Sequence, residues 1–189
     1  MSPAIVAGSV TSPAGIRAAG VHCGIKADRP DLALVVTDAP AAAAACFTTN
    51  RVQAAPVQVS RAQIRRGRAQ AVVISSGNAN AATGEAGLRD AWEMVELTAR
   101  SLGISRDLVL VASTGVIGVP LPMDRLRGSI PALAASLGPH GDQAAEAILP
   151  TDAFAKTGAG PVEVAGRAVT LGGMAKGAPL RKLPASRSE

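Results

Sequence analysis

The sequence predicts an α/β fold with at least one sheet covered by helices, and three observations lead to it. Short apolar runs typical of buried strands alternate with segments of helical periodicity. Hydrophobic residues make up 48% of the 189 residues, enough for one good core or two small layers. Aromatic residues make up only 2%, so Ala, Val, Leu and Ile must build the core, which suggests closely packed layers.

The first third of the chain reads mainly as strands. Glycines punctuate residues 13–26 in a way typical of strands and turns rather than a helix. The continuous apolar run 31–36 indicates a buried strand. We expect the alanine-rich stretch 41–47 to be a further strand, and the alternating residues 56–59 to be a short one.

The middle of the chain contains the clearest helix. Ser60 is expected to cap a short polar helix that ends near Gly67, and 71–75 is expected to be a buried strand. Apolar residues then recur on one face of 83–103, and Gly103 is a suitable helix stop. That face comprises Leu88, Trp92, Val95, Ala99 and Leu102.

The remaining elements continue the alternation. The apolar run 108–112 predicts a strand, and Pro122 suits the first turn of a helix, which Pro131 would kink or divide. A second helix is expected over 141–148. Two short strands within 162–171 predict a hairpin, and 172–177 is expected to be a flexible turn carrying one buried lysine.

A turn of small residues, 113–118, is the first candidate site. It places the hydroxyl of Thr114 beside Gly115. Because glycine has no side chain, a ligand can approach the backbone closely there. A hydroxyl and an N–H can donate two hydrogen bonds to one oxygen, as in an oxyanion hole for acyl transfer. From local chemistry alone, a purely structural turn is the alternative.

A second loop, 76–84, is dense in hydroxyls, amides and glycine, so its backbone donors could meet an anion. Because it lacks the Gly-Lys-Ser/Thr ending of a phosphate loop, we do not expect nucleotide binding.

The net charge of +5 raises the question of nucleic-acid binding. Its cations are scattered, apart from clusters at 65–68 and 181–182, and no aromatic residues are interleaved for base stacking. We expect a solvated basic face with a few cations for anionic substrates, and no nucleic-acid partner.

A metal site and a membrane-spanning segment are also not expected. Cys23 and Cys46 are isolated, and His22 and His140 belong to no ligand cluster, which favours reduced thiols in a cytoplasmic protein without a metal. The apolar runs are short and broken by charge or glycine, so no membrane span is predicted.

Several motifs, taken together and in order, closely resemble the ornithine acetyltransferase family, the bifunctional glutamate N-acetyltransferases of arginine biosynthesis. The resemblance covers roughly residues 10–178. Its motifs are Ser76-Gly77-Asn78-Ala79-Asn80-Ala81, Thr83-Gly84, Ser113-Thr114-Gly115-Val116-Ile117-Gly118, Leu121-Pro122-Met123-Asp124, Thr151-Asp152 and Gly172-Gly173-Met174-Ala175-Lys176-Gly177, with earlier matches at 15–26, 31–36, 47–52 and 54–56.

This resemblance implies the layered α/β fold of the DmpA/ornithine-acetyltransferase type, here only its α-chain part. It implies a precursor that cuts itself before an internal threonine. That threonine becomes the N-terminus of a β chain and takes acetyl from N-acetylornithine to glutamate through an ester. No cofactor is implied, acetyl-CoA is a further co-substrate of some members, and the two chains commonly form a heterotetramer.

The resemblance also assigns roles to four residues. Thr114 and Gly115 match the oxyanion-hole pair, Thr151 lies in the segment that contributes a substrate-binding threonine, and Lys176 matches the substrate-binding lysine. A cation at Lys176 suits a carboxylate. Without the resemblance, Lys176 would read as an ordinary surface lysine.

The match stops at Ala178, so we divide the chain into an α-chain domain, 1–178, and a divergent basic tail, 179–189. The tail contains no Ala-Thr junction, and the nucleophile is therefore absent from this chain. Pro150, Ala153 and Ala155 also depart from the family pattern. Two alternatives follow: an inactive truncated or frameshifted fragment, and an anion-binding α/β module without catalysis.

Overall fold

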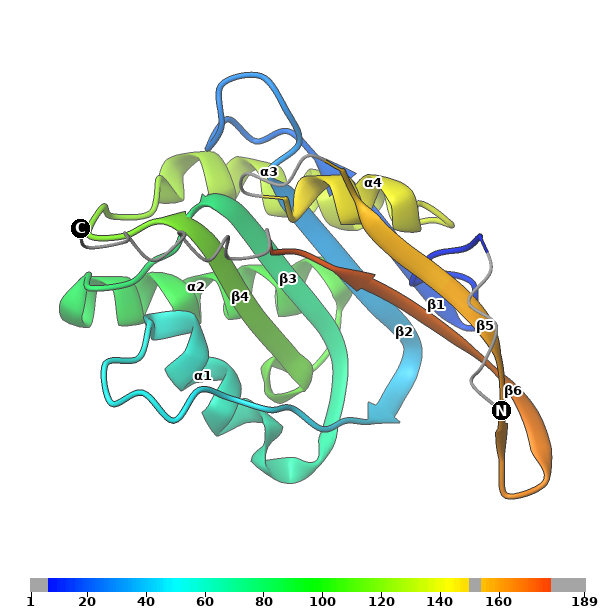
Figure 1. The fold of residues 1–189 in the computed structure, drawn as a ribbon. Coiled ribbons are helices and arrows are strands. Elements are labelled where there is room, and N and C mark those ends of the chain that lie inside the picture. Colours follow the sequence, from blue (N-terminus) through cyan, green and yellow to red (C-terminus); the bar gives the residue numbers. More distant parts are fainter. Residues whose placement is uncertain (1–6, 150–153, 178–189) are drawn as a thin grey trace, which may run out of the picture.

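The centre of the molecule is a four-stranded sheet in the order β1-β2-β3-β4 (Figure 1). The computed structural model describes residues 7–149 and 154–177. The strands are β1 (Ile16–Val21), β2 (Leu32–Ala42), β3 (Arg68–Asn78) and β4 (Val109–Val116). Strands β1, β2 and β3 are antiparallel neighbours, whereas β4 runs parallel to β3. The carboxyl ends of β3 and β4 therefore meet at one edge of the sheet.

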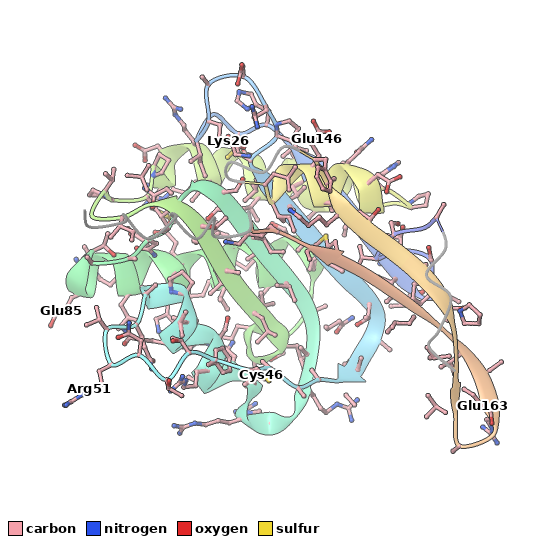
Figure 2. All side chains as sticks on the ribbon, viewed as in Figure 1. Lys26, Cys46, Arg51, Glu85, Glu146 and Glu163 are labelled. Atoms are coloured by element: carbon pink, nitrogen blue, oxygen red, sulfur yellow. The ribbon has the colours of Figure 1, made fainter. Side chains whose placement is uncertain are left out.

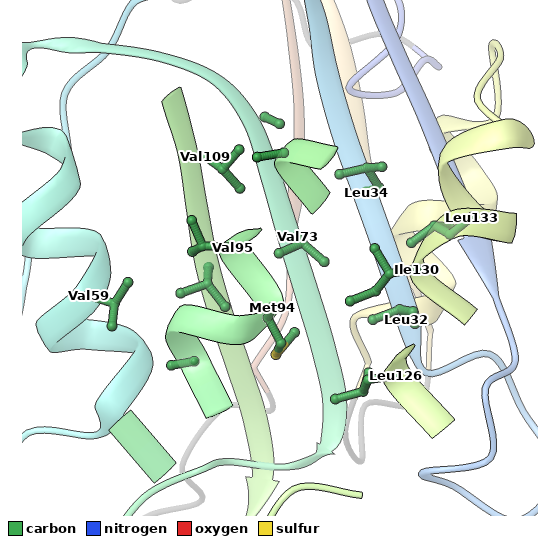
Figure 3. Packing of buried hydrophobic residues seen from close by; sticks show 14 of the residues in the cluster. Leu32, Leu34, Val59, Val73, Met94, Val95, Val109, Leu126, Ile130 and Leu133 are labelled. Carbon is green, nitrogen blue, oxygen red and sulfur yellow. The ribbon is translucent and has the colours of Figure 1, made fainter. Parts of the chain in front are cut away.

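Three helices cover one face of this sheet (Figure 3). They are α1 (Ala55–Gln63), α2 (Gly84–Leu102) and α3 (Met123–Ala135), and the short 3₁₀ helices Ile64–Arg66 and Arg106–Leu108 lie before β3 and β4. The buried side chains between helices and sheet are aliphatic, as the composition predicts. Among them are Val59, Met94, Val95, Leu126, Ile130 and Leu133 from the helices, and Leu32, Leu34, Val73 and Val109 from the strands.

The opposite face carries α4 (Gly141–Ala147) and a hairpin of β5 (Lys156–Val164) and β6 (Arg167–Ala175). Strand β2 shows why both faces are covered. Leu32 and Leu34 point toward the three-helix layer, while Ala33 between them packs with Ala144 and Ala147 of α4. Strands buried on both sides read as continuous apolar runs, which is the pattern of 31–36.

The structure confirms most predicted elements. Helix α2 ends where Gly103 adopts a left-handed conformation with φ 66°, as expected for a glycine helix stop. Helix α3 contains Pro131, and its side chains Leu126, Ile130 and Leu133 are buried. The hairpin has its turn at Ala165 and Gly166, although its strands are longer than the sequence pattern indicated.

Two expected strands are wrong. Residues 56–59 lie within α1. Pro56 occupies the first turn, where the missing N–H of proline costs no hydrogen bond within the helix. Ser60 is accordingly inside this helix rather than its cap. The stretch 41–47 is irregular after Ala42, because the pairing of β2 with β3 ends at Ala42 and Arg68.

Two expected turns are also strands in part. Strand β4 continues through Thr114 to Val116, because β3 continues to pair with it as far as Asn78. Strand β6 likewise continues through Gly172 and Gly173 to Ala175, paired with the beginning of β5.

The buried face of α2 is turned relative to the predicted one. Val95 and Ala99 are buried as expected, but the rest of the buried stripe consists of Gly87, Ala91, Met94 and Thr98. Leu88, Trp92 and Leu102 are partly buried at its margin.

Candidate active site

The candidate site lies where β3 and β4 end side by side. In their parallel ladder, Ser76 is paired with Thr114 and Gly77 with Gly115. Open α/β sheets bind ligands outside the carboxyl ends of their parallel strands, so this edge is a favourable position for a site.

Thr114 meets Lys176 at this edge. The Lys176 ammonium donates a hydrogen bond to the Thr114 hydroxyl oxygen, although the two residues are 62 positions apart. A lysine ammonium has donors and no acceptor, so the Thr114 oxygen accepts this bond and its own hydrogen remains able to donate. Lys176 is exposed rather than buried, which corrects the expectation for 172–177.

Gly115 lies next to this pair in a conformation that other residues rarely adopt, with φ 137°. A Cβ at this position would lie 2.2 Å from the carbonyl carbon of Gly77 and 2.5 Å from the nitrogen of Asn78. The position therefore requires glycine, and the tight contact fixes the Gly115 backbone against the end of β3. The hydroxyl of Thr114 and the N–H of Gly115 are thus adjacent donors on one rigid strand end.

Two side chains near this edge bind the end of α4 and the residues after it. Ser76 donates to the carbonyl of Ala147 at 2.5 Å, and the ammonium of Lys26 donates to the carbonyl of Leu149 at 2.7 Å. Thr151, the predicted substrate-binding threonine, follows two residues after Leu149 but lies outside the described residues.

Lys26 is held on its other side by the loop between β1 and β2. Its ammonium donates to the Pro30 carbonyl at 2.6 Å, and its backbone N–H donates to Asp31 at 2.9 Å. Burial lowers the pKa of Lys26, and the neighbouring Asp31 charge opposes this effect. Figure 2 shows Lys26 in this loop, near Glu146 of α4.

The buried Asp31 also faces Cys23. It accepts a hydrogen bond from the Cys23 N–H at 2.6 Å. Burial, together with the Asp31 carboxylate, raises the pKa of the Cys23 thiol to about 12. Cys23 is therefore a protonated structural thiol, whereas Cys46 is exposed.

The loop 76–84 uses its polar side chains internally. Asn80 donates to the Gly87 carbonyl at 2.8 Å and accepts from the Thr83 hydroxyl at 2.7 Å. Asn78 donates to the carbonyls of Val119 and Pro120, each at 3.0 Å. These contacts favour a structural role for the loop over the anion site that its composition suggested, and the sequence alone gave no signal for the partners of Asn78 or Lys26.

Two kinds of feature are absent from the described residues, a metal-binding group and a membrane-spanning helix. Across 7–149 and 154–177, no group of three His, Cys, Asp or Glu side chains could hold a metal ion. No helix in those same ranges is long and apolar enough to cross a membrane.

A parallel-strand edge with paired hydroxyl and N–H donors is the kind of site that acyl-transfer chemistry uses. A family model described as "ArgJ family" matches residues 17–182. The chain belongs to the ArgJ family.

Curated relatives and solved structures agree with this assignment. The chain is 54% identical over 176 residues to the arginine biosynthesis bifunctional protein ArgJ of Symbiobacterium thermophilum. This match covers 91% of this chain and 44% of the relative. The corresponding protein of Gloeobacter violaceus is 51% identical, with 90% and 43% covered. The chain thus spans less than half the length of these relatives.

Two crystal structures share the fold. That of ArgJ from Bacillus halodurans is 40% identical with a TM-score of 0.86, and the match covers 95% of this chain and 97% of that one. That of ornithine acetyltransferase from Mycobacterium tuberculosis, determined in complex with ornithine, is 41% identical with a TM-score of 0.88 and the same coverage. The predicted α/β fold of the ornithine-acetyltransferase type is confirmed.

Proposed function

We propose that this chain is the α-chain portion of an ornithine acetyltransferase, which transfers acetyl from N-acetylornithine to glutamate in arginine biosynthesis. Its part is to supply the oxyanion hole and some of the substrate pocket. The nucleophilic threonine belongs to the β chain, as the resemblance to the ornithine acetyltransferase family implies.

The observation that carries this proposal is the contact between Lys176 and Thr114 beside Gly115. The ammonium donates to the Thr114 oxygen, and the hydroxyl hydrogen is then directed away from that contact. The positive charge also polarises the hydroxyl, which strengthens the bond that it can donate. Two donors of this kind stabilise negative charge on a carbonyl oxygen.

In the proposed reaction, the β-chain threonine hydroxyl attacks the acetyl carbonyl of N-acetylornithine and forms a C–O bond. Its own amine takes the hydroxyl proton. Thr114 and Gly115 donate to the oxygen that becomes negative. The C–N bond then breaks, the proton passes to the departing ornithine amine, and the acetyl remains as an ester. The amine of glutamate attacks this ester by the same steps in reverse.

Substrate binding is assigned to Lys176 and Thr151. An ammonium has three donors, so Lys176 can hold a substrate carboxylate while it also contacts Thr114. The ornithine complex of the Mycobacterium tuberculosis relative supports an amino-acid substrate of this class. Acetyl-CoA as a further acetyl donor and a cytoplasmic location belong to the same proposal.

The partner in this proposal is a β chain, with assembly into a heterotetramer. The coverage supports a second chain. The match covers 97% of each solved chain but only 44% of the Symbiobacterium protein, so the solved chains are about as long as this one and much shorter than that relative. Exposed apolar residues at the site edge also support a partner there. They include Val116, Ile117 and Val119, whose side chains are exposed beside the oxyanion-hole pair.

The test uses this chain alone and then together with a β chain of the family. Alone, the chain should acquire no covalent acetyl group from N-acetylornithine by mass spectrometry. With the β chain, one acetyl group should appear on the β-chain threonine and pass to glutamate. An acetyl adduct on the isolated chain, or no turnover by the complex, would contradict the proposal.

A non-catalytic anion-binding module is the second candidate, because Lys176 is exposed and already oriented by Thr114. Calorimetric titration of the isolated chain with glutamate separates the two. Tight binding by the chain alone, without turnover when the β chain is present, would favour the binding module.

A further inference from the structure

Asn78 lies against the oxyanion-hole pair at the end of β3. In the ladder its backbone is paired with both Thr114 and Val116, the two neighbours of Gly115. Its backbone nitrogen is also one of the atoms that a Cβ on Gly115 would strike, at 2.5 Å. Asn78 and Gly115 are therefore in direct backbone contact.

The side chain of Asn78 holds the segment that follows Gly115. Its amide nitrogen donates to the carbonyls of Val119 and Pro120, each at 3.0 Å. Its oxygen accepts from the backbone N–H of Asn80 at 2.8 Å. The residue is only 4% exposed, and both amide hydrogens have an acceptor. A buried amide so fully bonded has one orientation.

Asn80 connects this arrangement to α2. It is completely buried and adopts a left-handed conformation with φ 45°. Its side chain donates to the carbonyl of Gly87, in the first turn of α2, at 2.8 Å. The end of β4 is thus tied through two asparagines to a helix of the core.

We propose that Asn78 is a positioning residue for the donors of Thr114 and Gly115, an inference that rests on the proposed acyl-transfer function. Asn78 fixes Gly115 from both sides, through the ladder before it and through Val119 and Pro120 after it. Oxyanion-hole donors work only within about 2.7–3.1 Å of the developing charge. A small shift of the strand end therefore reduces the rate without removing either donor.

The test variant is Asn78→Asp, which keeps the shape and the acceptor for Asn80. It replaces two N–H donors by an oxygen that faces the carbonyls of Val119 and Pro120. The matched control is Asn50→Asp, because exposed Asn50 uses its side-chain oxygen to accept from Val52 N–H at 2.9 Å, and aspartate retains that bond. Asn78→Ser, too short to reach both carbonyls, is the second variant if Asn78→Asp does not fold.

The first measurement is made on this chain by amide NMR. In Asn78→Asp, the signals of Gly115 and Gly118 should shift at neutral pH, while those of Val72 and Leu110 in the sheet stay unchanged. Below the pKa of the new carboxyl, its O–H can donate again, so both glycine signals should return toward their wild-type positions. Asn50→Asp should show neither effect. Wild-type Gly115 signals at every pH in Asn78→Asp and in Asn78→Ser would overturn the proposal.

The second measurement is turnover by the complex of this chain with a β chain. Asn78→Asp should lower kcat at least about ten-fold and leave KM for N-acetylornithine within about two-fold, because the donors act on the transition state. An unchanged kcat, or a change confined to KM, would overturn the positioning role. If the wild-type complex is inactive, the acetyltransferase function itself is wrong, and the NMR result alone decides whether Asn78 positions Gly115.

Discussion

Ser60 is the residue whose replacement tests the structure most directly. Its hydroxyl donates to the Val111 carbonyl at 2.6 Å and accepts from the Val111 N–H at 2.9 Å. Within a strand, the N–H and C=O of one residue point to the same side. Both of these groups bond to Ser60 of α1 and therefore face away from β3, and β4 is an edge strand of the described sheet. Ser60 is therefore the neighbour that satisfies them.

Ser60→Ala should destabilise the chain by about 2–4 kcal/mol. Ser60 is 7% and Val111 2% exposed, so water cannot easily replace the hydroxyl. Each buried group left without a partner costs about 1–3 kcal/mol. The better helix propensity of alanine in α1 offsets at most about 0.5 kcal/mol. For a domain of this size, the expected loss lowers Tm by about 5–15 °C.

Urea unfolding of this chain, followed by circular dichroism, measures the effect. The matched control is Ser101→Ala, which removes a hydroxyl that donates at 2.8 Å to the Leu97 carbonyl within α2. It should change the free energy of unfolding by less than about 0.5 kcal/mol. The reasoning would be refuted if Ser60→Ala were as stable as Ser101→Ala.

Three further predictions concern the site and the thiols. In the complex with a β chain, Thr114→Val should lower kcat about 10²–10³-fold because it removes an oxyanion donor, whereas Thr114→Ser should retain most activity; equal rates for both variants would contradict the role. Gly115→Ala should lower the urea midpoint of this chain, since its Cβ would lie 2.2 Å from backbone, and an unchanged midpoint would contradict this. At pH 8, iodoacetamide should alkylate exposed Cys46 at least about ten times faster than Cys23, whose pKa is raised to about 12 by burial and Asp31; mass spectrometry would show equal labelling if this is wrong.

The raised pKa of Cys23 also makes the free energy of unfolding depend on pH. The folded state keeps the thiol proton at pH values where the unfolded state loses it. The contribution of Cys23 is therefore fully present below pH 9 and falls as pH rises from 9 to about 12. In urea unfolding, Cys23→Ala should weaken the loss of stability between pH 9 and about 12. The same loss in Cys23→Ala as in the wild type would show that Cys23 does not cause it.

The sequence by itself determined the elements whose signal is local. The periodicity of 83–103 and the glycine that follows predicted α2, because amphipathicity and a left-handed stop depend on neighbouring residues alone. Continuous apolar runs likewise predicted the doubly covered strands. The family motifs predicted Thr114, Gly115 and Lys176 as site residues, and the structure places Lys176 in contact with Thr114 beside Gly115.

The tertiary structure decided what depends on distant partners. Residues 56–59 alternate like a strand, yet they form a helix because Val59 and Ser60 pack against the core and β4. The turn expected over 113–118 is strand as far as Val116, because β3 lies beside it.

Lys176 contacts Thr114, which is 62 residues away in the sequence. Asn78 donates hydrogen bonds to Val119 and Pro120, which are about 40 residues away. No local pattern encodes such contacts. They arise when the sheet, the hairpin and the loop at its edge pack together, and this packing gives the two donors their fixed positions.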